Sequence, residues 1–305
     1  MISIHVDVDN IWIWEEESGL KVPYSQELMF DQAMPTLLEL FERYSIKSTF
    51  FIVGKDLRSK FCRNFCVEAS QKGHEIANHT TSHPLAVHNL SRREKEYEIR
   101  ECDELISSTI NKKPVGFRAP GYYIDQDMVD VLIKYDYLYD TTVLPGVAVF
   151  AMRIFRALNR SFSAEKTFGR NRYLFTSRSV TRLFGEKNKD RFIYEIPISV
   201  APFLRTPIHS TFLYFFGTTY FKTMLSLLDA YSTHIVYLFH AVDALRLPHD
   251  EALERNVLPL RQTFERRTEL IDLILYSLNE LKRPFSTTEQ MIAKFDDQLI
   301  GRSSV

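Results

Sequence analysis

The sequence predicts an α/β fold whose parallel sheet is either open or closed into a barrel. Short runs of β-branched and aromatic residues alternate along the chain with longer segments of helical periodicity. Several polar residues stand at the ends of the predicted strands, where the sites of parallel α/β folds collect. No internal repeat or low-complexity linker interrupts the alternation. We therefore expect a single domain over residues 1–305, although length alone would also allow two.

Seven short runs of β-branched and aromatic residues are predicted as strands. They lie at residues 2–8, 47–53, 75–77 and 115–117, around residue 137, and at residues 192–196 and 235–239. The first run contains apolar residues at Ile4, Val6 and Val8. Because side chains two apart share a face of a strand, these three are expected to point into the core.

Helical periodicity fills the intervals between these strands. The predicted helices span residues 26–44, 61–72, 91–110, 219–231 and 257–281, with a last one from residue 288. Gly73 is typical of the position that follows a helix C-terminus. Ser91, with Glu94 three residues later, has the pattern of a capping box. Ser286 is predicted to cap the last helix.

Residues 146–190 break the alternation and are predicted to be an insertion within the domain. Residues 146–189 contain ten Lys or Arg against two Glu, in a chain of net charge −1. The first part, VAVFAMRIFRALNRSF, combines apolar and basic side chains, which suits an anionic membrane surface. An exposed helix that packs on the barrel through its apolar face explains the same pattern equally well.

Composition excludes several classes of protein. The three cysteines, Cys62, Cys66 and Cys102, are too few for a disulfide framework and are expected as reduced thiols. No run of 18 apolar residues predicts a membrane span, and the N-terminus lacks the pattern of a secretory signal. We therefore expect a cytoplasmic protein, peripheral on the inner membrane face if the insertion binds lipid. No nucleic-acid partner is expected.

Two pairs of polar residues suggest a metal centre. His79 and His83, in HTTSH, would share a face if that turn were helical. Asp7 and Asp9 point the same way from a strand, and two close carboxylates need a cation to offset their repulsion. One Asp beside two imidazoles makes the usual three-ligand catalytic zinc set and leaves a position for water. The simpler explanations are surface histidines and an Asp that caps the turn at Asn10.

Other residues could complete the chemistry. The second Asp of the pair can act as a base toward that water. Arg118, in FRAPGYY, offers a fixed positive charge for the base to pair with. His240, in YLFHAVD, follows another predicted strand and could protonate a leaving amine. A lone His in an apolar strand is more often a core residue. The catalytic interpretation of His240 therefore rests on the other candidate site residues.

The order and wording of these segments resemble the NodB-type polysaccharide deacetylases, carbohydrate esterases with a distorted (β/α) barrel. The segments concerned are HVDVDN (5–10), STFFIVG (48–54), GHEIANHTTSH (73–83), FRAPGYY (117–123), YDYLYDTT (135–142), YLFH (237–240) and PFSTTEQM (284–291). They occur in the family's order and cover essentially the whole chain, and GHEIANHTTSH is highly specific. The resemblance implies a single distorted (β/α) barrel domain that contains the basic insertion.

The resemblance also implies a role for each site residue. The expected ligands of one divalent ion, with Zn²⁺ as the expected metal, are Asp9, His79 and His83. Asp7 would be the general base, and Arg118 would orient it.

The remaining roles concern the substrate. His240 would be the general acid, and the backbone N–H of Gly121 would stabilise the oxyanion together with the metal. Tyr122 and His209 are expected to contact the substrate.

Two departures from the family pattern bear on these roles. The usual adjacent Asp pair is split here as Asp7-Val-Asp9, which resembles the branch acting on lipid-carrier-linked or other small glycans. The split leaves the roles of Asp7 and Asp9 exchangeable. The usual Asp-Trp of the fourth motif is absent, so the carboxylate that would tune His240 is either Asp140 or Asp243.

The sequence is therefore interpreted as a metal-dependent hydrolase that removes an acetyl or formyl group from an amino sugar. A cytoplasmic enzyme does not meet exported polymers, so we expect a sugar on a polyprenyl phosphate or a nucleotide. The basic insertion favours the lipid-linked sugar and an anionic membrane surface as partners. Residues 206–209 and 212–216 either line the sugar pocket or belong to the core. The alternatives are an amidohydrolase of the same fold for a non-sugar substrate such as a ureide, and a binding protein with a vestigial site.

Overall fold

The computed structural model describes residues 1–19, 21–146, 173, 175–186 and 189–302. It contains one sheet whose strands are β1 Ile2–Val8, β2 Thr49–Ile52, β3 Glu75–Asn78, β4 Gly116–Phe117, β5 Tyr139–Asp140, β6 Thr181–Phe184, β7 Phe192–Glu195 and β8 Ile235–His240. Their order across the sheet is β6-β7-β5-β4-β3-β2-β1-β8. Neighbouring strands are parallel except for β6 and β7, which are antiparallel. The prediction of a parallel sheet is confirmed for all but this edge.

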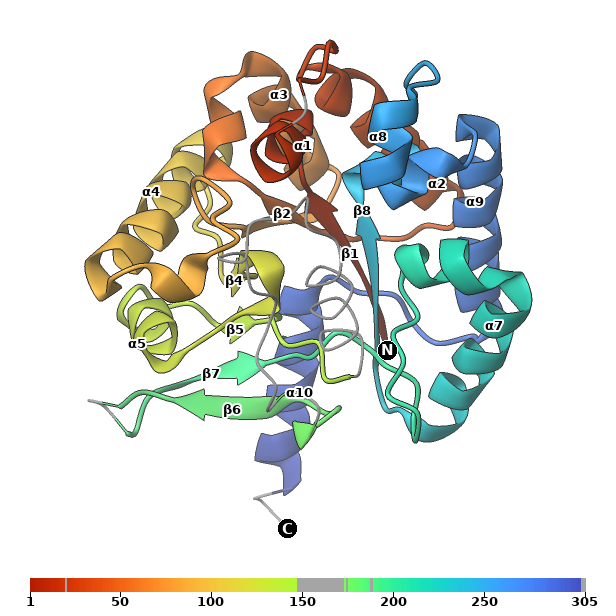
Figure 1. Cartoon of the computed structure of the whole chain (residues 1–305). Helices are drawn as coiled ribbons and strands as arrows, with labels where there is room; N and C mark the ends of the chain where they lie inside the picture. Colours follow the sequence, from red (N-terminus) through yellow and green to blue (C-terminus); the bar gives the residue numbers. More distant parts are fainter. Residues whose placement is uncertain (20, 147–172, 174, 187–188, 303–305) are drawn as a thin grey trace.

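Helices cover the outer side of the sheet, which curls into a half-barrel (Figure 1). They are α1 Ile11–Ser18, α2 Met34–Arg43, α3 Lys60–Gln71, α4 Arg92–Ile110, α5 Gln126–Lys134, α7 Ser210–Tyr231, α8 Glu251–Asn256, α9 Phe264–Glu280 and α10 Thr288–Arg302. Short helical turns lie at Met29–Ala33, Gly54–Arg58, Val87–Asn89, Pro120–Tyr122, Ala241–Ala244 and Leu258–Arg261. The predicted distorted (β/α) barrel is confirmed.

Strand β1 is buried on both faces. Its alternate side chains point to two different surroundings, one apolar and one polar. Ile4, Val6 and Val8 belong to the large apolar cluster that also contains residues of α2. The alternate residues face polar partners, because the hydroxyl of Ser3 lies 3.1 Å from that of Thr288 at the start of α10. A strand with an apolar and a polar buried face can therefore carry functional groups inside the barrel without losing its core contacts.

The segment after β7 narrows the gap between the two ends of the sheet. The backbone N–H of Ser199 donates to the carbonyl of Val236 in β8 at 3.3 Å, and the Val236 N–H donates to the Ser199 hydroxyl at 2.9 Å. At the opposite end of the barrel, Ser286 N–H donates to the Ile2 carbonyl at 3.0 Å. These contacts join the segment after β7 to β8 and the segment before α10 to β1, which itself pairs with β8.

Most predicted elements are present within a few residues of their expected bounds. The capping box at the start of α4 is confirmed, since Ser91 N–H donates to the Glu94 carboxylate at 2.7 Å and Glu94 N–H to the Ser91 hydroxyl at 3.4 Å. Gly73 has a φ of 86°, as expected for a residue that ends a helix. The helix predicted over 26–44 is instead a π-helical turn at Met29–Ala33 followed by α2.

Other predictions of the elements were wrong or incomplete. Thr287 rather than Ser286 caps α10, because Gln290 N–H donates to the Thr287 hydroxyl at 3.3 Å and the Ser286 hydroxyl has no partner in the described part of the chain. Helix α7 begins at Ser210, nine residues before the predicted start. Helices α1, α5 and α8 and strand β6 were not predicted.

The insertion predicted at 146–190 is described only in part. The basic and apolar stretch at its start lies outside the described residues. Near its end, β6 pairs with β7 and extends the sheet. Among the helices that the structure describes, none is both long and apolar enough to cross a membrane. Cys62, Cys66 and Cys102 are buried and free, as expected.

Candidate active site

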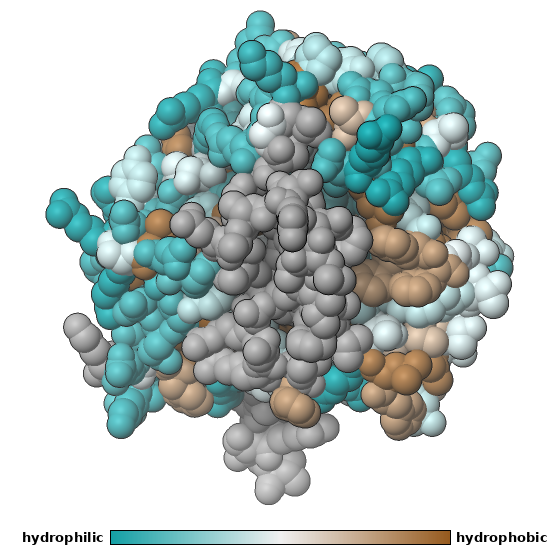
Figure 2. Space-filling view, viewed as in Figure 1, coloured by the Kyte–Doolittle hydropathy of each residue, from teal (hydrophilic) through white to brown (hydrophobic). Residues whose placement is uncertain are grey.

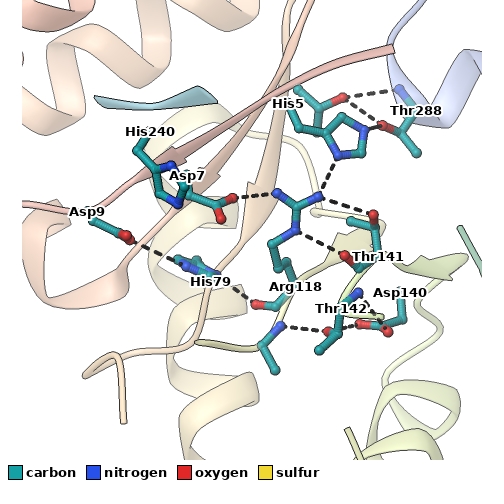
Figure 3. Close-up of polar contacts among 12 residues, drawn as sticks. His5, Asp7, Asp9, His79, Arg118, Asp140, Thr141, Thr142, His240 and Thr288 are labelled. Atoms are coloured by element: carbon teal, nitrogen blue, oxygen red, sulfur yellow. Dashed lines mark hydrogen bonds and ion pairs between the residues drawn. The ribbon is translucent and has the colours of Figure 1, made fainter. Parts of the chain in front are cut away.

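Strands β1, β3, β4 and β8 deliver the predicted catalytic residues to one end of the barrel. Asp7 lies near the end of β1 and is the register partner of His240 at the end of β8. His79 and Arg118 directly follow β3 and β4. Figure 3 shows these side chains together with Asp9 around the mouth of the barrel. The predicted clustering of these groups at the carboxyl ends of the strands is therefore what the structure shows.

Three of these residues form a candidate metal site. Oδ1 of Asp9 lies 3.5 Å from Nε2 of His79 and 3.3 Å from Nε2 of His83. Ligands about 2.1 Å from one tetrahedral ion lie about 3.4 Å from one another. The Asp9 oxygen is buried and has no hydrogen-bond partner among the described residues, as a ligand atom would. The donor set and its spacing therefore fit a divalent ion.

The electrostatics of Asp9 agree with this fit. Burial alone would raise the pKa of the Asp9 carboxyl, but the neighbouring imidazoles of His83 and His79 hold that pKa well below its usual value. A carboxylate is the form that binds a cation.

The loop that carries His79 and His83 is not helical. The sequence predicted a shared face for the two side chains only if this turn were helical. Thr80 and His83 have left-handed backbones, with φ of 66° and 54°. Glu98 on α4 holds the loop: its carboxylate accepts the N–H groups of Thr81 at 2.9 Å and Ser82 at 2.8 Å. The two imidazoles converge because this loop is fixed from outside.

A hydrogen bond to the backbone orients the ring of His79. Its Nδ1 lies 2.8 Å from the carbonyl oxygen of Arg118, an acceptor, so Nδ1 carries the proton. The neutral ring then presents an unprotonated Nε2 toward Asp9. Such a partner behind a metal-binding histidine is typical of metal centres.

Arg118 is the central buried group of the site. It is 1% exposed, and its Nη1 donates to Oδ1 of Asp7 at 2.6 Å. Its Nε donates to the carbonyl of Thr141 at 3.0 Å, and its guanidinium lies over the ring of Phe51 at 4.3 Å. Arg118 therefore lies within hydrogen-bonding distance of Asp7, as the sequence predicted for the base.

His5 is part of this arrangement and was missed from the sequence. Its Nδ1 lies 2.6 Å from Nη2 of Arg118, and its Nε2 lies 2.7 Å from the hydroxyl of Thr288. Because arginine can only donate, Nδ1 must accept and the proton must be on Nε2. Burial and the charge of Arg118 hold the pKa of His5 well below its usual value. The alternation of β1 was the available signal, since His5 shares a face with Asp7.

Asp140 and Asp243, the two candidates for tuning His240, have different surroundings. The carboxylate of Asp140 accepts the hydroxyl of Thr142 at 2.5 Å, and burial raises its pKa. Asp243 accepts the backbone N–H of His240 at 3.0 Å and the hydroxyl of Ser210 at 2.6 Å. Burial also raises the pKa of Asp243, and the charge of His240 opposes that rise. Asp243 is therefore the carboxyl beside His240, and Asp140 instead supports the loop after β5.

His209 lies next to His240 and lacks partners of its own. The centroids of their rings are 6.2 Å apart. His209 is 4% exposed, and neither of its ring nitrogens has a hydrogen-bond partner among the described residues. Burial, with smaller contributions from His240 and Arg118, lowers the pKa of His209 to about 3. An unpaired buried imidazole beside the mouth is available to a substrate.

The loop after β4 contributes the remaining predicted residues. Gly121 and Tyr122 both have left-handed backbones, with φ of 65° and 57°. Burial and the charge of Asp7 raise the pKa of the Tyr122 hydroxyl. The hydroxyl of Thr142 anchors the start of this loop, because it accepts the N–H of Ala119 at 2.8 Å. The loop therefore adjoins Asp7, although no hydrogen bond of Gly121 defines an oxyanion site.

Comparison with known proteins shows which proteins this chain resembles. A family model described as polysaccharide deacetylase matches residues 24–139, which include His79, His83 and Arg118. A peptidoglycan deacetylase of Helicobacter pylori is 27% identical over 112 residues, 36% of this chain and 37% of that protein. A peptidoglycan-N-acetylglucosamine deacetylase of Bacillus cereus is 33% identical over 91 residues, 30% of this chain and 41% of that protein. These matches show a likeness to the polysaccharide deacetylases over residues 24–139, as expected from the motifs.

Solved structures agree at the level of the fold. A Mycobacterium smegmatis protein described as a polysaccharide deacetylase superposes with a TM-score of 0.56 at 16% identity, covering 89% of this chain and 90% of that one. A point mutant of the peptidoglycan deacetylase PdaC of Bacillus subtilis gives a TM-score of 0.50 at 12% identity, covering 100% and 95%. The chain spans less than half the length of the curated relatives that it matches. The resemblance to polysaccharide deacetylases and the fold expected from the motifs are thus confirmed.

Proposed function

We propose that this NodB-type chain is a metal-dependent hydrolase that removes an N-acetyl or N-formyl group from an amino sugar. The observation that carries the proposal is the convergence of Asp9, His79 and His83 opposite the Asp7–Arg118 pair, at the mouth that also holds His240. Relatives that are named as deacetylases of peptidoglycan support the reaction class.

The proposed cofactor is one divalent ion, Zn²⁺, held by Asp9, His79 and His83. Two imidazoles and one carboxylate are a usual catalytic zinc set. When bound, such an ion supplies Lewis acidity and lowers the pKa of water.

Different residues around the ion are proposed to carry out the two proton transfers. Asp7 accepts a proton from the attacking water, and Arg118 holds the Asp7 carboxylate in position through its 2.6 Å bond. His240, across the β1–β8 pair, gives a proton to the leaving amine. The N–H of Gly121 is the proposed donor to the oxyanion, and Tyr122 and His209 are the proposed substrate contacts. Asp243 keeps the backbone of His240 in place.

The proposed substrate is an amino sugar on a polyprenyl phosphate, with a nucleotide-linked sugar as the second choice. The split Asp7-Val-Asp9 motif supports a small glycan, and the ten basic residues of 146–189 support an anionic membrane surface as partner.

Mass spectrometry of reaction products tests the proposal. The zinc-loaded protein is incubated with lipid-linked and nucleotide-linked N-acetyl- and N-formylhexosamines, with Asp7→Asn as the inactive control and His249→Asn as an exposed-histidine control. We expect the lipid-linked sugar to lose about 42 mass units when hydrogen replaces an acetyl group, or about 28 when it replaces a formyl group. If only the nucleotide-linked sugars react, the proposed lipid-linked substrate is wrong. If no amino sugar reacts, the proposed function is wrong.

A further inference from the structure

We infer that an aromatic surface along α7 docks the protein on a lipid bilayer and holds the barrel mouth at the level of the headgroups. We define this α7 aromatic surface by two clusters of side chains: Phe215 with Phe216 before the kink of α7, and Phe203 with Leu204 and Tyr231 at its end. The inference gains its meaning from the proposed lipid-linked substrate, but it concerns a different part of the chain from the basic insertion, and it can be measured without turnover.

Exposure is the first observation. Phe203 is 77% exposed, and Phe215 and Phe216 are 62% and 60% exposed. Five of the nine large hydrophobic side chains that are exposed in the described part of the chain belong to these two clusters. Figure 2 shows apolar surface, in brown, on the side of the molecule where Figure 1 places α7. Single exposed apolar residues are ordinary, but a gathered set marks a site of contact.

The second observation is the absence of charge. Residues 206–221 contain no Asp, Glu, Lys or Arg, although they include the exposed first half of α7. A solvated helix face normally carries charged residues. Exposed Phe and Tyr without charges match the boundary between headgroups and acyl chains, where aromatic side chains are favoured. Gly217, with φ of 78° and ψ of 179°, kinks α7 directly after Phe216, so the two aromatic side chains end the first half of the helix.

The third observation is continuity with the site. The ring of His240 lies 6.2 Å from that of His209, which lies 5.0 Å from that of Phe212. Phe212 stacks on Phe216 with centroids 6.0 Å apart. A row of adjacent rings therefore joins the barrel mouth to the exposed surface. Contact of Phe216 with a bilayer would bring His240 close to the headgroup region.

Charge complementarity points to a lipid rather than a protein partner. Arg205 follows the exposed Phe203 and Leu204, and its Nη1 donates to the carbonyl of Thr176 at 2.8 Å and to that of Pro145 at 3.5 Å. Pro145 and Thr176 flank residues 146–175, which contain six Lys or Arg against one Glu. Arg205 thus joins both flanks of this basic segment beside Phe203 and Leu204. Apolar side chains next to a basic segment suit an anionic leaflet.

Vesicle flotation of the full chain tests the inference. We compare neutral phosphatidylcholine vesicles with vesicles containing phosphatidylglycerol, at low and at high salt. Attraction by basic residues falls with salt, whereas hydrophobic contact does not. We expect binding that survives high salt, and that Phe215→Ser/Phe216→Ser lowers this remaining partition coefficient about tenfold or more.

The matched control is Tyr97→Ser/Tyr276→Ser, which removes two aromatic side chains of similar exposure outside the surface, at 47% and 55%. We expect this variant to bind vesicles as the wild type does. Equal binding by the Phe215→Ser/Phe216→Ser variant and the wild type would overturn the inference. A second result would also overturn it: the wild type forms a dimer and does not bind vesicles, and the variant is a monomer by analytical ultracentrifugation. The surface would then join two copies of the chain.

A second readout separates this inference from the proposed function. Hydrolysis of a water-soluble N-acetylhexosamine by a Phe203→Ser/Leu204→Ser variant, whose residues lie outside the expected sugar pocket, should match that of the wild type, while hydrolysis of the lipid-linked sugar in vesicles should fall. Vesicle binding without any hydrolysis would retain the docking surface and overturn the enzyme. Hydrolysis without vesicle binding would retain the proposed enzyme activity and overturn the docking surface.

Discussion

The two walls of the barrel mouth differ in how their buried polar atoms are satisfied. On one wall, which we call the Arg118 wall, the guanidinium bonds to Asp7, His5 and Thr141. On the other, which we call the His240 wall, the ring nitrogens of His209 have no partners among the described residues, and one oxygen of Asp243 has none.

The difference indicates a division of labour. Groups that are bonded on every side are preorganised, and their positions do not depend on a ligand. Buried groups without partners cost free energy in the folded protein, and they persist where a ligand supplies the missing bonds. We therefore expect substitutions on the Arg118 wall to lower both stability and turnover. Substitutions on the His240 wall should lower turnover while leaving stability unchanged or raised.

The metal site, between the walls, gives the largest expected effect. His83→Asn should reduce bound zinc from about one equivalent to near zero, because one of three ligands is lost. Asparagine tolerates the left-handed backbone of His83, so the fold should be preserved. Bound metal is measured by atomic emission and the fold by circular dichroism. Hydrolysis should be undetectable, and a chelator should have the same effect on the wild type. His249→Asn, at an exposed histidine, should retain the metal.

Asp7→Asn tests the Arg118 wall directly. We expect kcat to fall by about 10²–10⁴-fold, the usual effect of losing a general base, while zinc stays bound. Arg118 would lose its carboxylate partner, and breaking a buried ion pair costs about 3–5 kcal/mol of unfolding free energy. Steady-state kinetics, metal analysis and urea unfolding give the three values. If Asp7→Asn loses zinc and Asp9→Asn keeps it, the roles of the two aspartates are reversed.

His5→Leu should have a smaller effect on the same wall. It leaves Nη2 of Arg118 without its acceptor, so we expect kcat to fall about tenfold with little change in KM, and unfolding free energy to fall by about 1–3 kcal/mol. His5→Asn keeps an acceptor near the position of Nδ1 and should recover part of kcat. Kinetics of both variants check this. A purely structural role of His5 would show equal loss of stability in the two variants and unchanged kcat in both.

The sequence revealed the groups that follow strands but not the groups that hold them. Asp7, Asp9, His79, Arg118 and His240 could be predicted to meet because parallel strands end at one edge of a sheet. The support of the histidine loop by Glu98 could not be predicted, because it depends on how α4 packs beside that loop. Residue spacing carries no information on such a contact between elements.

The elements themselves show the same limit. The capping box of α4 was predictable because Ser91 and Glu94 lie within one turn of each other. Strand β6 was not, since its residues alternate half-buried and exposed in a region of high positive charge, and only pairing with β7 makes them a strand. That Asp243 rather than Asp140 lies beside His240 also required the structure, because both follow predicted strands.

His209→Phe gives the smallest expected effect and tests the His240 wall through acid stability. The folded-state pKa of His209 is about 3 and its unfolded value is about 6.5, so the unfolded chain binds the proton more tightly. Between these values stability therefore falls as pH falls, by about 2 kcal/mol from this group at pH 5. The variant should lose that part of the slope and be at least as stable as the wild type at pH 7.5, because phenylalanine leaves no nitrogen unpaired.

Urea unfolding from pH 7.5 to 5 measures this difference, with a chelator present so that metal release contributes nothing. The comparison isolates His209, because the other buried histidines, among them His5 and the pair His74 and His234 with pKa values of about 4, are the same in both proteins. His249→Phe, at an exposed position, should keep the full slope. Identical slopes in His209→Phe and the wild type would mean that His209 finds a proton acceptor in the folded protein. The His240 wall would then be satisfied internally like the Arg118 wall, and the proposed substrate contact would lose its basis.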